Sequence, residues 1–372
     1  MKIGILSLVL HSNYGGILQS YALQTVLERI GHEVTVLNRN KDLHRSISQE
    51  MRSYVKYFVK KFLLRRSIIY KSAKQLNIER YEREVNTRAF IEKYIHTRMV
   101  KYLTNETFRE MDAVIVGSDQ VWRPRYFKKQ WNTGIEDAYL RFLADGNTKR
   151  ISYAVSFGTD DWEYNEEETQ KCMHLLQKFN AVSVREQSGI ELCEKFLGRK
   201  DAKWVLDPTM LLSKEDYEKL IPKDMNASGD LMCYVLDDNL AVSSLIKRVA
   251  EEGNYKAFYA NSRVKDAKLS IQPPVEQWLA GFRDARLVIT DSFHACVFSI
   301  LFHKPFIVIG NRKRGYSRFE SLLRQFGLEN RLIENETQFA PSLLKPLPDD
   351  VYIKFDKYRN NSMAFLNKAL TD

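Results

Sequence analysis

The sequence lacks the residue spacings that hold structural metals or disulfides. Its four cysteines, Cys172, Cys193, Cys233 and Cys296, are scattered through 372 residues without a CxxC pair, and its seven histidines form no HxxxH or HExxH pair. Zinc sites and disulfide-rich domains depend on such spacings. We therefore expect no bound metal, no cofactor and a reducing, cytoplasmic environment.

Long hydrophobic runs and low-complexity tracts are also lacking. A membrane-spanning helix needs roughly 18 to 20 successive residues without charge, and no stretch approaches this length. Hydrophobic residues make up 44% and charged residues 28% of the chain, a balance that is typical of a globular enzyme. At roughly 150 residues per domain, the length predicts two domains and an insertion.

Positive charge is concentrated in one segment. Residues 41–101 contain 16 lysines and arginines but 6 acidic residues, and the difference of +10 equals the net charge of the whole chain. Within this segment apolar residues recur at helical spacing, with cations between them: Met51, Tyr54, Val55, Phe58, Val59, Phe62 and Leu63, with Arg52, Lys56, Lys60 and Lys61. The pattern predicts a basic amphipathic helix.

Three interpretations of this helix are open. Its apolar stripe packs on a domain, or residues 51–66 bind an anionic membrane or a lipid diphosphate, which would place the protein peripherally at the inner face of the membrane. Nucleic acid is the third, but no helix-turn-helix, finger or aromatic RNA-binding signature accompanies the charge. We therefore expect no nucleic-acid partner.

Strands and helices alternate in both halves of the chain. Short apolar runs that read as buried strands occur at residues 2–9, 33–37, 113–116, 151–155 and 181–184, and again at 231–235, 255–259, 287–290 and 305–309. Amphipathic helical patterns separate them, which is the signature of βαβ units and parallel sheets.

We therefore predict an α/β fold with two Rossmann-like domains that face a cleft, as in the GT-B architecture. The first domain covers residues 1–204 and contains a basic helical insertion at about 41–108. The second covers residues 205–348, and a helix in residues 349–372 packs across the domains.

Five short segments carry a family resemblance. They are Ser12–Gln24 (SNYGGILQSYALQ), Val116–Trp122 (VGSDQVW), Val184–Glu186 (VRE), Leu206–Pro208 (LDP) and Thr290–His294 (TDSFH). In this order they resemble the polysaccharide pyruvyl transferase family. The resemblance implies phosphoenolpyruvate as donor, a saccharide of a capsule or exopolysaccharide precursor as acceptor, and a pyruvate ketal bridging two sugar hydroxyls.

Donor binding is expected to involve several cations, because phosphoenolpyruvate carries a phosphate and a carboxylate. Arg185 follows a buried strand directly, although an ion pair with Glu186 or Asp207 is the alternative. Arg312 and Arg318 lie in or beside a basic loop that precedes a helix, and a solvated loop is the alternative there.

Two further residues complete the predicted donor set. Lys304 follows the apolar helix that begins near His294. Ser292 stands where many members of the family carry a basic residue, two positions before the histidine, so a donor contact is expected to have moved.

Transfer requires a proton for the methylene carbon of the donor, and histidine is the side chain that titrates nearest neutrality. His294 lies in the polar turn between a buried strand and a helix, so we predict that it is the acid. Asp119 and Asp291 also follow buried strands, and either one orients the histidine or accepts a hydroxyl proton. Helix capping is the alternative for both.

The loop after the first strand is predicted to bind the acceptor, because glycine lets a backbone approach a ligand closely. Its residues are Asn13, Tyr14, Gly15 and Gly16, and Ser118 joins them from another strand end. The acceptor is expected to be a saccharide, either free or carried on a lipid diphosphate. A glycosyltransferase that uses a nucleotide sugar and an inactive scaffold in polysaccharide assembly are the competing functions.

Overall fold

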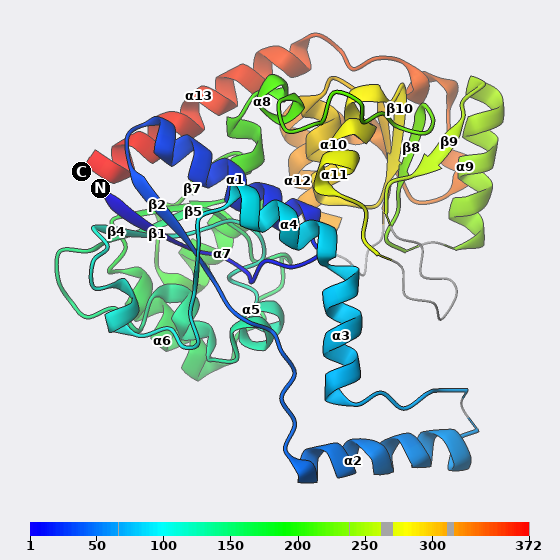
Figure 1. The fold of residues 1–372 in the computed structure, drawn as a ribbon. Coiled ribbons are helices and arrows are strands. Elements are labelled where there is room, and N and C mark those ends of the chain that lie inside the picture. The colour runs from blue at the N-terminus through cyan, green and yellow to red at the C-terminus, as the bar shows by residue number, and fades with distance from the viewer. Residues whose placement is uncertain (66, 238, 262–270, 311–315, 372) are drawn as a thin grey trace.

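The computed structural model describes residues 1–65, 67–237, 239–261, 271–310 and 316–371, and these residues form two parallel sheets, each flanked by helices (Figure 1). The fold prediction is confirmed: the chain is an α/β protein with two Rossmann-like halves in the GT-B arrangement. The two ends of the chain lie close together in Figure 1.

The first sheet has the strand order β3-β2-β1-β4-β5-β6-β7. Its strands are β1 (Lys2–Leu6), β2 (Glu33–Asn38), β3 (Thr97–Met99), β4 (Ala113–Val116), β5 (Lys149–Val155), β6 (Ala181–Val184) and β7 (Lys203–Trp204). Leu6, the last residue of β1, pairs with Leu37 on one side and Val116 on the other. The strand order reverses at β1, and such a switch point opens a crevice beyond the carboxyl ends of the strands.

Helices on both faces bury this sheet. They are α1 (Tyr14–Arg29), α4 (Val85–Tyr94), α5 (Pro124–Trp131), α6 (Glu166–Leu176) and α7 (Gln187–Leu197), with the short turns η2 (Asn105–Phe108) and η3 (Ile135–Tyr139). All four residues of β4 are buried, as expected for a central parallel strand covered on both sides, which reads as a continuous apolar run.

The second sheet has the order β12-β11-β10-β8-β9. Its strands are β8 (Leu231–Tyr234), β9 (Ala257–Tyr259), β10 (Leu287–Thr290), β11 (Phe306–Ile309) and β12 (Leu332–Ile333). The helices around it are α9 (Leu240–Gly253), α10 (Val275–Asp284), α11 (Phe293–Leu301) and α12 (Tyr316–Phe326), with the short turns η5 (Glu329–Arg331), η6 (Glu336–Gln338) and η7 (Pro341–Leu344). Here β8 and β10 flank the point where the order reverses.

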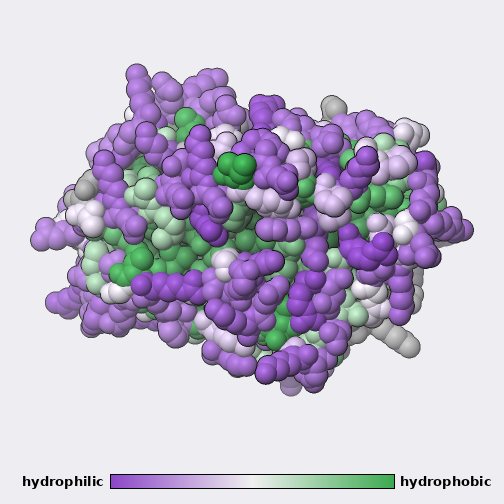
Figure 2. Space-filling model, turned by 90° about the horizontal axis from the view of Figure 1, so that it is seen from above, coloured by the Kyte–Doolittle hydropathy of each residue, from purple (hydrophilic) through white to green (hydrophobic). Residues whose placement is uncertain are grey.

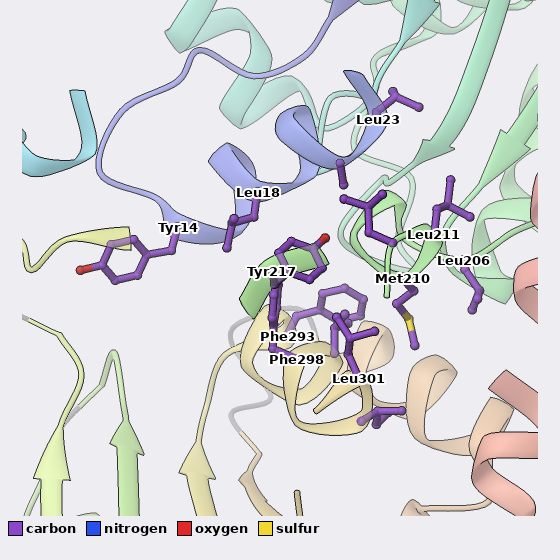
Figure 3. Close-up of a cluster of buried hydrophobic side chains, with 14 of the residues drawn as sticks. Tyr14, Leu18, Leu23, Leu206, Met210, Leu211, Tyr217, Phe293, Phe298 and Leu301 are labelled. Carbon is purple, nitrogen blue, oxygen red and sulfur yellow. The ribbon is translucent and has the colours of Figure 1, made fainter. Parts of the chain in front are cut away.

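One hydrophobic cluster runs between the two halves. It brings α1 together with α11 and with the connecting elements η4 (Pro208–Leu211) and α8 (Lys214–Glu218) (Figure 3). The ring of Tyr14 lies 5.4 Å from that of Trp278 and 6.1 Å from that of Tyr234, both in the second half. The first turn of α1 is therefore part of the contact between the halves.

The last helix, α13 (Asp350–Thr371), runs along both halves (Figure 1) and contacts β5 as well as α12. Lys149 Nζ donates to the Leu370 carbonyl at 2.7 Å, and the backbone N–H of Leu206 donates to Ser362 Oγ at 2.9 Å. These contacts join the end of the chain to the first sheet and to the connection between the halves.

Part of the basic segment forms an arm that projects away from both sheets (Figure 1). It consists of α2 (Ile47–Phe58), the π-helical turn η1 (Val59–Leu63) and the stalk helix α3 (Ala73–Arg83). No residue of these three elements is buried, so the interpretation that the apolar stripe packs on a domain is wrong. Among the described helices, none is both long enough and apolar enough to cross a bilayer.

Candidate active site

A cavity of about 700 Å³ lies where the carboxyl ends of the two sheets face each other. The first half contributes Asn13 after β1 and, after β4, Asp119, Gln120, Arg123, Arg125 and Tyr126. The second half contributes Leu236 and Asp237 after β8, residues 291–294 after β10, and Arg318 from the first turn of α12. The cavity therefore joins the two switch points at which ligands bind in sheets of this kind.

Arg185 forms the centre of a buried charge network behind this cavity. Its Nη1 donates to Asp207 Oδ2 at 2.8 Å, Nη2 lies 3.8 Å from Asp119 Oδ1, and Nε lies 3.9 Å from Glu186 Oε2. Burial lowers the pKa of Arg185, but the carboxylates of Asp207, Asp119 and Glu186 outweigh that effect and raise it. The guanidinium is thus held as a cation.

The ion pair with Asp207 was the alternative interpretation of Arg185, and the structure contains it. This ion pair does not engage every donor of the guanidinium, because Nε and Nη2 have no hydrogen-bond partner among the described residues. Glu186 is also occupied elsewhere: its Oε1 accepts from Ser156 Oγ and from the N–H groups of Phe157 and Gly158. Arg185 therefore retains donors for a further anion.

Asp207 links Arg185 to the predicted acid. Its Oδ2 accepts from Gln19 and lies 3.7 Å from His294 Nε2, and its Oδ1 accepts from the hydroxyl and N–H of Thr209. Burial raises the pKa of Asp207, but Arg185 and His294 more than offset this, so the pKa lies below its ordinary value. Sequence analysis gave Asp207 only as a partner for Arg185, although its Leu-Asp-Pro motif was a signal that could have identified it.

His294 is buried in the first turn of α11 and borders the cavity. Burial, with help from the Arg185 cation, lowers its pKa to about 4 although Asp207 acts in the opposite direction. Its Nε2 has no hydrogen-bond partner among the described residues. The imidazole is therefore neutral near pH 7, with one nitrogen unsatisfied.

Gly15 makes room for this imidazole. A Cβ atom at Gly15 would lie 2.0 Å from His294 Nδ1, so the start of α1 in the first half touches the histidine of the second half. At Gly16 a Cβ atom would lie 3.2 Å from the amide nitrogen of Asn13, a flexible side-chain end. The requirement for glycine at position 15 is thus explained by packing against His294.

Asp119 has backbone strain at the cavity wall. Its φ of 67° lies in the left-handed region, which is unusual for a residue other than glycine. The conformation is held because its carbonyl accepts the N–H of Ser156 at 3.0 Å and that of Val121 at 2.8 Å. Its carboxylate lies between Asn13 Nδ2, at 3.5 Å, and Arg185. Strained residues of this kind cluster at functional sites.

Asp291 borders the cavity, but its carboxylate is hydrogen-bonded to the loop after β8. Its two carboxylate oxygens accept the N–H groups of Leu236 at 2.7 Å and Asp237 at 2.8 Å. Burial raises the pKa of Asp291 despite these hydrogen bonds. Ser292, the next residue, is the N-cap of α11 and also borders the cavity, and its side chain forms no capping hydrogen bond.

Arg318 supplies a second guanidinium beside the first. Both guanidinium groups lie over the ring of Phe293, with Cζ–centroid distances of 4.4 Å for Arg185 and 5.8 Å for Arg318. Burial and the Arg185 charge lower the pKa of Arg318 to about 10, and its Nε has no hydrogen-bond partner among the described residues. Two neighbouring cations with unused donors favour an anion between them.

Three other predicted residues do not meet at the cavity. Tyr14 is buried in the contact between the halves, where its hydroxyl donates to the Pro273 carbonyl, and Ser118 is buried outside the lining. Lys304 lies at the far end of α11 and donates to the Arg283 carbonyl. Arg312 lies outside the described residues.

Sequence analysis missed two cations of the cavity wall, Arg123 and Arg125. Arg123 forms a forked ion pair with Glu163 at 2.8 Å, whereas Arg125 is exposed. Their position just after the Val-Gly-Ser-Asp-Gln-Val-Trp motif was the available signal. Within the described residues no group of three metal-ligating side chains is placed to hold an ion.

Acid is expected to destabilise the wild-type protein more than a His294→Gln variant. The folded pKa is about 4 against an ordinary 6.5, so between these values the unfolded chain binds a proton that the folded protein excludes. This contribution to stability is complete above pH 6.5 and decreases as the pH falls, by about 2 kcal/mol at about pH 5. Urea unfolding of both proteins, above pH 6.5 and at about pH 5, measures this loss of stability. The same pH dependence in both proteins would contradict the assignment.

Solved structures with a similar fold include two UDP-N-acetylglucosamine 2-epimerases and a heptosyltransferase. A UDP-N-acetylglucosamine 2-epimerase aligns with a TM-score of 0.52 and 13% identity over 100% of this chain and 95% of its own. A second, putative epimerase from Listeria monocytogenes gives 0.49 and 12% over 97% and 91%, and the E. coli heptosyltransferase WaaC with ADP gives 0.38 and 14% over 96% and 100%. At these identities only the fold is shared.

The sequence comparisons are more specific. None of the curated proteins matches the chain significantly. A family model described as polysaccharide pyruvyl transferase matches residues 13–313, a range that includes the cavity residues from Asn13 to His294. The match covers most of the chain, and this protein therefore belongs to the polysaccharide pyruvyl transferase family.

Proposed function

We propose that the protein transfers the pyruvyl unit of phosphoenolpyruvate to two hydroxyls of a saccharide in a surface polysaccharide precursor, forming a cyclic ketal. The observation that carries this proposal is the pair of guanidinium groups over Phe293, with unused donors, beside the buried imidazole of His294. Such a pair suits a small ligand with two anionic groups, because arginine binds phosphate and carboxylate through paired N–H donors.

The proposed reaction begins with protonation. His294 delivers a proton to the methylene carbon of the donor, which becomes a methyl group, and positive charge develops on the adjacent carbon. A sugar hydroxyl attacks that carbon, and the bond to the phosphate oxygen breaks. A second hydroxyl of the same acceptor closes the ketal. Of the two hydroxyl protons, one replaces the proton given by His294 and the other leaves with phosphate.

The donor itself is expected to activate His294. In the empty protein burial and Arg185 keep its pKa near 4, too low for an acid at neutral pH. A phosphate and a carboxylate bound at the two arginines would compensate the cationic charge and add negative charge nearby, which raises the pKa of an imidazole. Protonation is thereby coupled to occupancy by the donor.

The first half is proposed to hold the acceptor. Asn13 and Asp119 border the same cavity as His294, with Asn13 Nδ2 and Asp119 Oδ2 3.5 Å apart, so an amide donor and a carboxylate acceptor are available to neighbouring hydroxyls. Asp119 is the proposed proton acceptor. Another part of the wall from the first half consists of Arg123, Arg125 and Tyr126.

A glycosyltransferase that uses a nucleotide sugar is the competing function. The observation in its favour is a second cavity of about 380 Å³ that shares Asp237 and Asp291 with the first and is also lined by Asn239 and Glu334. Carboxylates suit the hydroxyls of a ribose better than they suit a phosphate. The two donors are thus expected to prefer different cavities.

Ligand-induced stabilisation separates the two functions. Phosphoenolpyruvate is expected to raise the melting temperature of the protein, since a ligand that binds only the folded state stabilises it, whereas UDP and GDP sugars are not. Incubation with phosphoenolpyruvate and a panel of galactosides, glucosides and mannosides should then give the mass increment of a pyruvate ketal. Stabilisation by a nucleotide sugar and not by phosphoenolpyruvate would contradict the proposal.

Arg318→Gln is expected to weaken phosphoenolpyruvate binding by about 10- to 100-fold, because a charged hydrogen bond to the anion contributes roughly 1.5 to 3 kcal/mol. The fold should be preserved, since among the described residues this guanidinium forms no ion pair. Isothermal titration measures the change. Arg324→Gln, an exposed change two turns along the same helix, is the matched control and should bind like the wild type.

A further inference from the structure

The arm exposes an apolar stripe that neither domain covers. Ile47 is 83% exposed, Met51 66%, Phe58 50%, Phe62 57% and Leu63 72%. Exposed apolar residues are ordinary when scattered, but a contiguous group marks an interaction site. The face of the molecule in Figure 2 differs from this arm: it is largely hydrophilic, and its apolar side chains lie between polar ones.

The stripe has helical geometry. Ile47, Met51, Phe58 and Phe62 are separated by four or seven residues, so they lie on one side of α2 and its continuation η1. The rings of Phe58 and Phe62 are 4.5 Å apart. The 17 residues of the two elements have a length of roughly 25 Å at the rise of an α-helix. A continuous apolar ridge therefore runs along the arm.

A side of α2 next to the stripe is fixed by the returning chain. Glu50 accepts from Tyr70 Oη at 2.7 Å and from the N–H of Ala73 at 3.1 Å. The ring of Tyr70 lies 5.1 Å from that of Tyr54 and 5.6 Å from that of Tyr57. These contacts orient the helix about its own axis and leave the stripe facing outward.

Capping boxes define both helices of the arm. Ser46 and Gln49 form one at the start of α2, and Ser72 and Gln75 form another at the start of α3. Each box satisfies orphan N–H groups at a helix start. The local sequence of the arm therefore specifies where each of its two helices begins.

Charge indicates what the stripe binds. Residues 47–65 carry five cations, Arg52, Lys56, Lys60, Lys61 and Arg65, and a single carboxylate, Glu50, which is bonded to Tyr70 and Ala73. Long basic side chains beside an apolar face can place their stems on hydrocarbon and their charges among lipid phosphates. Another protein surface would have to be both apolar and strongly acidic to match.

From this combination we propose that residues 47–65 dock in the plane of an anionic lipid bilayer, with the apolar stripe at the boundary between headgroups and acyl chains. The arm does not span the bilayer. It attaches the protein to the surface through one exposed helix.

The root of the arm contacts both halves of the molecule. Lys41 Nζ donates to Gln130 in the first half, and Asp42 forms an ion pair with Arg80 of the stalk. At the same end of the stalk, the Arg83 carbonyl accepts the N–H of Gln272, which belongs to the second half. Docking would therefore hold the cleft between the halves at a defined height above the lipid, whatever acceptor the site uses.

Vesicle binding by the full chain tests the proposal without any assay of transfer. Wild-type protein should sediment with vesicles of phosphatidylcholine and phosphatidylglycerol, weakly or not at all with phosphatidylcholine alone, and less in high salt. Lys56→Glu, Lys60→Glu and Lys61→Glu together should weaken binding at least about tenfold. Phe58→Ser with Phe62→Ser should weaken it similarly, because these changes remove part of the apolar contact.

A matched triple variant controls for net charge. Lys200→Glu, Lys223→Glu and Lys247→Glu change three exposed lysines outside the arm and should leave vesicle binding unchanged. Equal binding by the wild type and the arm variants would overturn the proposal. So would self-association of the wild type, detected by light scattering and abolished by the two serine changes, if vesicle binding were absent.

Discussion

His294→Gln is expected to reduce pyruvyl transfer by about 100- to 10,000-fold, the contribution typical of a positioned general acid. Glutamine keeps a polar side chain of similar reach but cannot deliver a proton to carbon. Stability near pH 7.5 should change little, because the wild-type imidazole is neutral there, with a pKa of about 4. The rate of ketal formation at saturating phosphoenolpyruvate measures the effect.

Two comparisons make this result specific. His174→Gln changes an exposed histidine on α6 and should leave the rate as in the wild type. Phosphoenolpyruvate should still stabilise His294→Gln, because the two arginines remain. A variant that transfers pyruvate at more than about a tenth of the wild-type rate would remove His294 from the role of acid.

The convergence of the site residues was predictable from the sequence, because residues that directly follow parallel strands meet at one edge of a sheet. Asp119, Arg185, Asp291 and His294 all follow buried strands. Three of them border the cavity, and Arg185 lies directly behind it. Their roles in catalysis stay predictions.

Placement that depends on tertiary structure could not be predicted in this way. Lys304 lies close to His294 in sequence, but α11 has nine residues, about 13 Å of helix, and carries the lysine away from the cavity. Tyr14 was expected to bind the acceptor, yet its ring fills the contact between the halves. Asp207 follows a strand of two residues, which is too short for a periodic signal.

The arm shows the same limit. Spacing alone predicted an amphipathic helix from Met51 to Leu63, and α2 with η1 confirms a helix there. The direction of its stripe depends on contacts from Tyr70 and Ala73 to Glu50. Those contacts follow from where the chain returns, which periodicity does not encode.

Gly15→Ala is expected to have the second large effect. The added Cβ would lie 2.0 Å from His294 Nδ1, a separation that only movement of the imidazole or of α1 can relieve. Overpacking of this kind costs about 1 to 3 kcal/mol. It would also displace the proposed acid, and transfer should fall far more than donor binding. Urea unfolding and the rate of ketal formation measure the two consequences.

The double variant Gly15→Ala with His294→Ala tests whether the imidazole is the cause. Without the ring, alanine at position 15 should cost little, because α1 then gains a better helix former. The two changes should therefore be non-additive by at least about 1 kcal/mol. Gly16→Ala is the matched control: its Cβ would meet the amide of Asn13 at 3.2 Å, and its effect should be the same with and without His294. If the effects of Gly15→Ala and His294→Ala on stability were additive, contact with the imidazole would not be the reason that position 15 requires glycine.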